Sequence, residues 1–281
     1  TQETPLHYCA RAGNENVLLE IVNHLHHRIL LSINKQDMNG WSPLLWAADQ
    51  GHLKIVKILL KNHARVDIFD DQGMTALHLC ADKGHGKVAD LLLRNKAFVN
   101  ARTKQGMTPL HLSARSGFHE LLVSLIDHHG AKVDALTMNR RSVVHLAAQN
   151  GKLKVCEALL TNTSWNVDVS ASDMQGLTPL HLAARHDHSN IVKLFLSTKP
   201  DLVTRSSIKK ARSPGLGPSS QNRSDREQST GTGRLCQKGD QPGEKPSRRE
   251  ADSSSPNHAQ DCSPGLIITV YYQALVLPKA R

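Results

Sequence analysis

One stretch of sequence recurs six times between residues 1 and 205, and it constrains the fold more than any other feature. Its copies read ETPLHYCARAG, WSPLLWAADQG, MTALHLCADKG, MTPLHLSARSG, RSVVHLAAQNG and LTPLHLAARHD. The hydroxyl residues that open them are Thr4, Ser42, Thr75, Thr108, Ser142 and Thr178, at spacings of 38, 33, 33, 34 and 36. Self-similarity at this period predicts stacked units, each of which contacts only its neighbours.

The remainder of each unit also repeats. A glycine is followed by a second apolar segment, such as IVKILL, VADLLL or IVKLFL, whose spacing places one apolar stripe on a helix. A turn-rich segment such as AFVNARTKQG then leads to the next hydroxyl residue. Each unit is therefore predicted to be two short antiparallel helices and a projecting hairpin loop, and stacking is required to bury the apolar stripes.

A unit of this length that carries the pattern T-P-L-H-x-A is identified as an ankyrin repeat. The expected fold is an all-α repeat solenoid of about six ankyrin repeats, each a helix-turn-helix plus a hairpin loop, followed by a disordered tail. We place the array at residues 1–205, with repeats at roughly 1–38, 39–71, 72–104, 105–138, 139–174 and 175–205. Residues 206–281 are rich in Ser, Gly, Pro, Arg and Gln without any period, which predicts disorder.

Two spacings and two substitutions depart from the pattern. The longer spacings add residues around HLHHRILLS and TNTSWNVDVS, where we expect decorated loops. A glycine ends the first helix in five units and predicts a left-handed turn, and Asp187 stands there in the sixth unit. Arg140 replaces the hairpin glycine of the fifth unit, so we expect that turn to be reshaped.

Thr108, His111 and Ser113 lie close enough in sequence to suggest a nucleophilic site. The other units, however, have Cys or Ala at the position of Ser113, which indicates a slot for a small side chain. We therefore expect the hydroxyl to cap the helix and the imidazole to tie it to the adjacent hairpin. The predicted structural motif residues are Thr4, His7, Thr75, His78, Thr108, His111, His145, Thr178 and His181.

No other pattern points to chemistry. Of the 17 histidines, those outside the repeated positions lack nearby cysteines or paired carboxylates, so no metal site is expected. Cys9, Cys80 and Cys156 take positions that hold small or apolar residues elsewhere, and we expect them to be buried. The odd total of five cysteines without CxxC fits a reducing cytosol. We expect no cofactor, no catalytic residues and no enzymatic activity.

Binding to a partner protein is expected where hairpin tips and first-helix ends line up. The residues after the hairpin glycine position are Trp41, Met74, Met107, Arg141 and Leu177. Such a ladder can dock a partner, or it can pack over neighbouring hairpins, and both interpretations stay open. Beside it lie the first-helix ends Asp49, Gln50, Asp82, Lys83, Arg115, Gln149 and Arg185. Their mixed charge argues against a nucleic-acid groove, although the net charge of +10 permits acidic partners.

The chain resembles the ankyrin array of the TRPN (no-mechanoreceptor-potential C) mechanosensory channels over about residues 1–204. The stretches that carry the resemblance are TPLHYCARAGNENVLLEIV, NGWSPLL, HARVDIFD, KAFVNARTKQGMTPLHL and DHSNIVKLFLSTKPDLVT, with Leu45 in place of histidine and the Asp187 turn. The resemblance implies a cytoplasmic array at the inner side of the plasma membrane, an elastic tether between a cation channel and the cytoskeleton (microtubules in that family). The alternative is a soluble ankyrin-repeat adaptor or regulatory scaffold, such as a phosphatase regulatory subunit.

The ends of the array lack the polar capping repeats that such stacks need. The first unit begins inside its hairpin, and the sixth is followed by the irregular tail. We therefore expect the chain to be a piece of a longer array and its tail to be an alternative or mispredicted end. The longest apolar run, residues 266–277, is shorter than the ~20 residues that a membrane-spanning helix needs.

Overall fold

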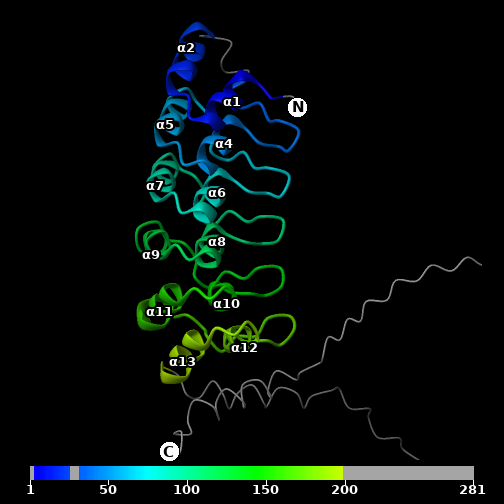
Figure 1. Cartoon of the computed structure of the whole chain (residues 1–281), viewed down its shortest axis with the longest axis vertical. Coiled ribbons are helices and arrows are strands. Elements are labelled where there is room, and N and C mark those ends of the chain that lie inside the picture. Colours follow the sequence, from blue (N-terminus) through cyan, green and yellow to red (C-terminus); the bar gives the residue numbers. More distant parts are fainter. Residues whose placement is uncertain (1–2, 26–31, 199–281) are drawn as a thin grey trace, which may run out of the picture. The chain divides into compact units, whose positions relative to one another are not determined.

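The computed structural model describes residues 3–25 and 32–198 of the chain. Within these ranges the named elements are helices, and one isolated antiparallel bridge joins Phe69 to Thr75. The predicted all-helical repeat solenoid is confirmed, with the helices arranged as a stack of pairs (Figure 1). The predicted disordered tail at 206–281, and part of the insertion around HLHHRILLS, lie outside the described residues.

The helices alternate between two layers along the chain (Figure 1). The inner helices are α1 (Pro5–Ala12), α4 (Pro43–Asp49), α6 (Ala76–Lys83), α8 (Pro109–Ser116), α10 (Val143–Gln149) and α12 (Pro179–Arg185). The outer helices are α2 (Glu15–Leu25), α5 (Leu53–Lys61), α7 (Gly86–Arg94), α9 (His119–Asp127), α11 (Leu153–Thr161) and α13 (Ser189–Thr198). Each inner helix packs on its own outer helix and on the next inner helix. Each of the six expected units holds one pair, while the boundaries chosen between units remain a prediction.

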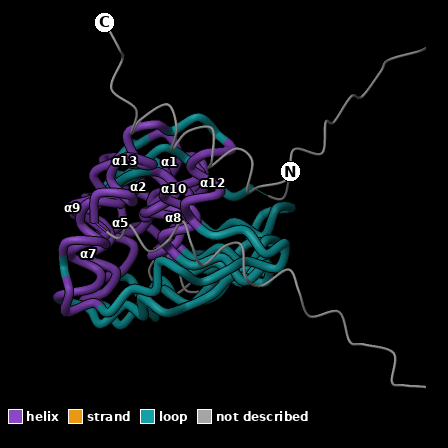
Figure 2. The backbone as a smooth tube through the Cα atoms, turned by 90° about the horizontal axis from the view of Figure 1, so that it is seen from below, coloured by secondary structure: helices purple, strands orange, loops and turns teal. Residues whose placement is uncertain are grey.

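Between an outer helix and the next inner helix the chain forms a hairpin, and the hairpins project to one side of the helices (Figure 2). One backbone N–H near each tip donates to a carbonyl of the preceding hairpin. The bonds run from Asp71 to Asn39 (3.3 Å), from Lys104 to Gln72 (2.9 Å), from Met138 to Gln105 (3.0 Å) and from Met174 to Asn139 (3.0 Å). The hairpins are therefore held in register through the main chain.

The core runs through the whole stack as a strip of aliphatic and small side chains. The small slot of each inner helix holds Cys9, Ala47, Cys80, Ser113, Ala147 and Ala183, all buried. The Ser113 hydroxyl donates to the Leu110 carbonyl of its own helix at 2.9 Å, which satisfies it without an external partner. The slot accepts Ala, Cys or Ser because little volume is available there.

The turns that end the inner helices have the predicted left-handed backbone. Gly51 has φ of 73° and Gly84 has φ of 80°, and Asp187 takes the same region with φ of 59°. Aspartate is one of the few residues other than glycine that visit this region readily.

The expectation that the fifth hairpin is reshaped at Arg140 is wrong. Arg140 keeps the left-handed conformation, with φ of 57°. Its N–H donates to the Thr137 carbonyl at 2.9 Å, as Gly73 N–H donates to Asp70 and Gly106 N–H to Thr103, both at 2.8 Å. The register set by the neighbouring hairpins outweighs the preference of an arginine for other backbone angles.

The insertion around TNTSWNVDVS forms a loop that contains a short 3₁₀ helix, η2 (Thr163–Trp165). The indole N–H of Trp165 donates to the carboxylate of Asp127, the last residue of α9, at 2.9 Å. The extra residues thus connect to the preceding unit without interrupting the stack.

Candidate functional site

The five residues expected to form a ladder each close one hairpin. Their carbonyls accept a hydrogen bond from the N–H four residues earlier, as between Asp70 and Met74 at 3.0 Å. Met74 and Met107 are half-buried and pack against the core, and Trp41 and Arg141 are half-buried as well. Leu177 is only 8% exposed and offers little surface to a partner. The first four ladder residues therefore combine packing with partial exposure, and Leu177 is buried.

At Trp41 the ladder becomes an aromatic cluster. The rings of Trp41 and Trp46 lie 4.5 Å apart between centroids, and the Trp46 indole donates to the Asp37 carboxylate at 3.0 Å. The Arg11 guanidinium lies 5.2 Å from the Trp46 ring and 5.3 Å from the ring of Tyr8, distances at which cation–π attraction acts. This cluster presents flat apolar surface beside a fixed cation, a combination suited to protein contacts.

Burial by itself would raise the pKa of the Asp37 carboxyl. Hydrogen bonds from the Trp41 backbone, the Trp46 indole and the Asn39 backbone outweigh burial, so that the pKa is lowered. Asp37 is therefore an ionised anchor of the aromatic cluster.

The predicted first-helix ends mostly engage one another across unit boundaries. Arg115 donates to Asp82 at 2.8 Å, and the hydroxyl of Ser116 meets the same carboxylate at 2.9 Å. Lys83 lies 4.0 Å from Asp49, which also accepts from Gln50 at 2.8 Å. These pairs form a charged row along the ends of α4, α6 and α8.

Arg141 joins a second such contact. Its guanidinium donates to the Asp173 carboxylate at 3.1 Å and to the Gln149 side chain at 3.0 Å. Arg185 is exposed at the end of α12. Apart from Arg185, the charged groups named on this face are tied between units, and the surface left for a partner carries charges of both signs.

The motif histidines form a buried spine, and three of them, His7, His78 and His145, also reach the next unit. Nδ1 accepts from the backbone N–H of the hydroxyl residue three positions earlier, so the ring proton lies on Nε2. From there His7 donates to the Trp41 carbonyl at 3.0 Å and His145 to the Leu177 carbonyl at 3.2 Å. Nε2 of His78 contacts carbonyls of both Ala101 and Met107.

Four rings of the spine, those of His78, His111, His145 and His181, have lowered pKa values. Burial lowers the pKa of His78 and of His111 to about 4, although backbone groups nearby oppose that effect. The pKa values of His145 and His181 are lowered by burial too. Among the described residues, Nε2 of His111 is a buried atom without a hydrogen-bond partner. A neutral, tied imidazole suits a structural role and not a general base facing substrate.

Sequence reasoning missed the apolar side chains that are most exposed. Met38, Met138 and Met174 at the hairpin tips are 69%, 68% and 68% exposed, and Phe69 and Phe98 are 59% and 70% exposed. The three methionines share one position of the hairpin, just before its last turn residues, and that recurrence was visible in the sequence. The phenylalanines occupy two different positions, so no period marked them.

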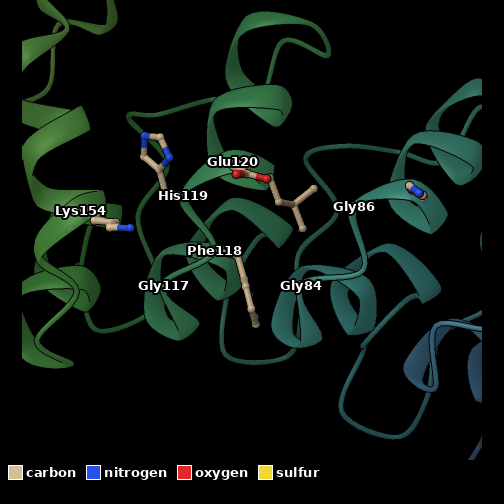
Figure 3. A pocket seen from close by; sticks show the side chains of 9 residues that line it. Gly84, Gly86, Gly117, Phe118, His119, Glu120 and Lys154 are labelled. Atoms are coloured by element: carbon tan, nitrogen blue, oxygen red, sulfur yellow. The ribbon is translucent and has the colours of Figure 1, made fainter.

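A hollow of about 440 Å³ lies between the starts of α7 and α9, and Figure 3 shows the side chains that line it. Phe118, His119, Glu120 and Lys154 line it, and Gly86 leaves one side open. None of the predicted site residues lies there. Its wall carries charges of both signs and a structural phenylalanine, so it favours no class of ligand.

Over the described ranges, no group of three or more His, Cys, Asp or Glu side chains is placed to hold a metal ion. None of the described helices is long and apolar enough to cross a bilayer. Cys9, Cys80 and Cys156 are free and buried, as predicted.

The comparisons with known proteins agree with this architecture. A family model described as ankyrin repeats (3 copies) matches residues 1–70, 62–137 and 110–206. A human protein, transient receptor potential cation channel subfamily A member 1, is 33% identical over 169 residues, which are 58% of this chain and 15% of that channel. Palmitoyltransferase AKR1 of Saccharomyces cerevisiae is 37% identical over 73 residues, 26% of this chain and 10% of the enzyme. Delta-latroinsectotoxin-Lt1a of Latrodectus tredecimguttatus is 35% identical over 79 residues, 28% of this chain and 6% of the toxin.

Proposed function

The chain belongs to the ankyrin repeat family, and from this premise we propose that it is the protein-binding and tethering segment of a transient receptor potential (TRP) type cation channel. Ankyrin repeats are non-catalytic protein-interaction modules. The observation that carries the channel assignment is the 33% identity to the human subfamily A channel, which extends over more than half of the chain. The chain spans only 15% of that channel's length. That a pore exists elsewhere in the parent protein is therefore part of the proposal.

The geometry supports a tether. The units meet through helix contacts, single hairpin bonds and ion pairs between neighbours, and each junction can yield by a small amount under load. The finer proposal is the TRPN-like arrangement, in which the array lies at the cytoplasmic side of the plasma membrane and contacts the cytoskeleton. The relative found belongs to subfamily A, so the support reaches the TRP channels as a group.

The genomic sequence on both sides of residues 1–205 tests the channel assignment. Further repeats followed by about six apolar segments of ~20 residues would select a channel. A complete locus without such segments would exclude it.

We propose the ladder face, defined by Trp41, Met74 and Met107 with the neighbouring helix ends, as the docking surface for the tether's partner. Co-sedimentation with polymerised tubulin, the partner class implied by the TRPN resemblance, provides a direct assay. Replacing Trp41, Met74 and Met107 by Ser is expected to abolish co-sedimentation. Met138→Ser, which changes an exposed tip side chain outside the ladder, is the matched control and is expected to bind normally.

The urea midpoint of each variant separates binding from folding. An unchanged midpoint with lost binding supports the docking surface. A collapse of the midpoint in the ladder variants would show that these side chains serve packing instead.

The second candidate is a soluble adaptor or regulatory scaffold. The yeast palmitoyltransferase and the spider toxin are not TRP channels, and each matches this chain over fewer than 80 residues. Such arrays thus occur in proteins of several classes. The adaptor reading predicts a locus without pore segments and a folded client on the ladder face.

A further inference from the structure

A cleft of about 450 Å³ lies between the hairpin that precedes α6 and the hairpin that precedes α8. Phe69 and Phe98 line it, together with Val66 and Ala101. None of the ladder residues takes part. The chain has only four phenylalanines, and two of them stand at this one cleft with more than half of each side chain exposed. Exposed aromatic rings gathered at one concave place are typical of a binding site, whereas single exposed apolar side chains are common on any surface.

Three cations surround these rings: Lys96, Arg102 and Lys104, which we call the basic triad. Several cations elsewhere on the array pair with carboxylates, as Arg115 does with Asp82. Within the described ranges no ion pair joins a carboxylate to any member of the triad. The one carboxylate in the lining, Asp67, is neutralised by a two-pronged contact with Arg65 at 2.7 and 3.1 Å.

The triad is partly fixed in place. The Arg102 guanidinium donates to the Leu136 carbonyl of the next hairpin at 2.7 Å, which leaves its remaining N–H groups for another acceptor. The Lys104 backbone is held by the bond to Gln72 between hairpin tips. The cleft is therefore preorganised for an anionic group beside an apolar one.

We propose that this cleft binds an acidic peptide segment of a partner protein, with one aromatic or long aliphatic side chain seated between Phe69 and Phe98 and its carboxylates on the basic triad. The volume fits a few side chains of a peptide, and the unpaired cations supply charge complementarity. A nucleic acid fits less well, because a phosphate backbone needs a longer basic track than three cations at one cleft.

Fluorescence anisotropy of the full chain with a labelled peptide, one phenylalanine flanked by glutamates, tests the proposal. Saturable binding that weakens as salt rises is expected. Exchanging the glutamates for glutamines, or the phenylalanine for alanine, is expected to weaken binding, and exchanging the glutamates for lysines is expected to abolish it.

Two variants of the chain locate the site. Phe98→Ser removes an exposed ring without touching the core and is expected to weaken binding about tenfold or more. Lys104→Glu is expected to weaken binding and to reduce its salt dependence. Met138→Ser, at a similarly exposed apolar side chain outside the cleft, is the matched control and is expected to leave binding unchanged.

The absence of saturable peptide binding, or equal binding by Phe98→Ser, would overturn the proposal. Capture of oligothymidylate or of phosphatidylserine vesicles that depends on Lys104, with no binding of the peptide, would replace it by a nucleic-acid or lipid site. If Phe98→Ser shifts the urea midpoint, Lys104→Glu decides alone. The variant with Ser at Trp41, Met74 and Met107 is expected to keep peptide affinity, which separates this result from that of the proposed function.

Discussion

The imidazole of His85 lies directly over Gly51 of the preceding unit. Its Nε2 donates to the Asp49 carbonyl at 2.9 Å, and its ring atoms Cε1 and Nδ1 come within 2.6 Å of the point where a Cβ on Gly51 would stand. The same arrangement brings His52 over Gly13 and His188 over Gly151. Glycine is therefore required at the turn after the inner helix for two reasons. Its backbone is left-handed, and the histidine ring that covers it leaves no room for a Cβ.

Gly51→Ala is expected to destabilise the array by more than the ~1–2 kcal/mol that a left-handed alanine costs, because the His85 ring must also move. Gly176→Ala is the matched control: its φ is 77°, but no atom lies within 4 Å of the added Cβ. Urea unfolding measures both. Equal losses would show that the ring contact contributes nothing, and adding His85→Ala to Gly51→Ala is expected to recover part of the difference.

Arg140→Gly is expected to raise the free energy of unfolding by up to about 1 kcal/mol. The substitution relieves a left-handed arginine, and the larger entropy of glycine in the unfolded chain offsets part of the gain. Arg140→Ala keeps a Cβ and is expected to change little. A loss of stability in Arg140→Gly would mean that the arginine side chain holds the hairpin.

Stability is expected to fall as the pH drops from about 6.5 to about 4. His78 and His111 have folded pKa values of about 4, below the ordinary 6.5, so the unfolded chain binds protons in this range while the folded chain does not. Each histidine contributes at most about 1.4 kcal/mol per pH unit. Urea midpoints across this window measure the loss, and NMR titration that finds both rings changing near pH 6.5 would contradict it.

Cys80 and Cys156 are expected to resist alkylation in the folded chain. Both are buried, and burial raises the pKa of the Cys80 thiol and raises that of Cys156 to about 12, so little thiolate forms near neutral pH. Iodoacetamide labelling should be done in a chain with Cys236→Ser and Cys262→Ser, which removes the thiols outside the described residues. Labelling of both residues is expected to require urea, and rapid labelling of Cys80 or Cys156 without it would show that α6 or α11 opens readily.

Much of the fold could be predicted because the same pattern recurs in six units of the sequence. The T-P-L-H pattern marked where each inner helix begins, and the period marked how units stack. The small slot was recognised because Ser113 aligns with Cys80 and Ala147. Arg140 was misjudged because local preference was weighed without the hairpin bonds on either side, which act across more than 30 residues of sequence.

The candidate site was less predictable, since a period shows that residues line up but not which side of the hairpin faces solvent. Met74 and Met107 pack against the core, whereas Met138 and Met174, also in hairpins, are exposed. The need for glycine without a Cβ at Gly51 depends on the ring of His85 in the next unit. The sequence feature that could have indicated it is the histidine that recurs after this turn, as at His52 and His85. The cleft at Phe69 and Phe98 combines two positions that no single repeat contains.

The bonds that join the hairpin tips use only backbone atoms, and their donors are Asp71, Lys104, Met138 and Met174. An acid, a base and two thioethers thus occupy one geometric position without altering the bond they make. The side chain at each hairpin tip can therefore change, one unit at a time, while the backbone bonds between the hairpins are kept. Single substitutions at these positions can give such a chain new binding preferences without changing its fold.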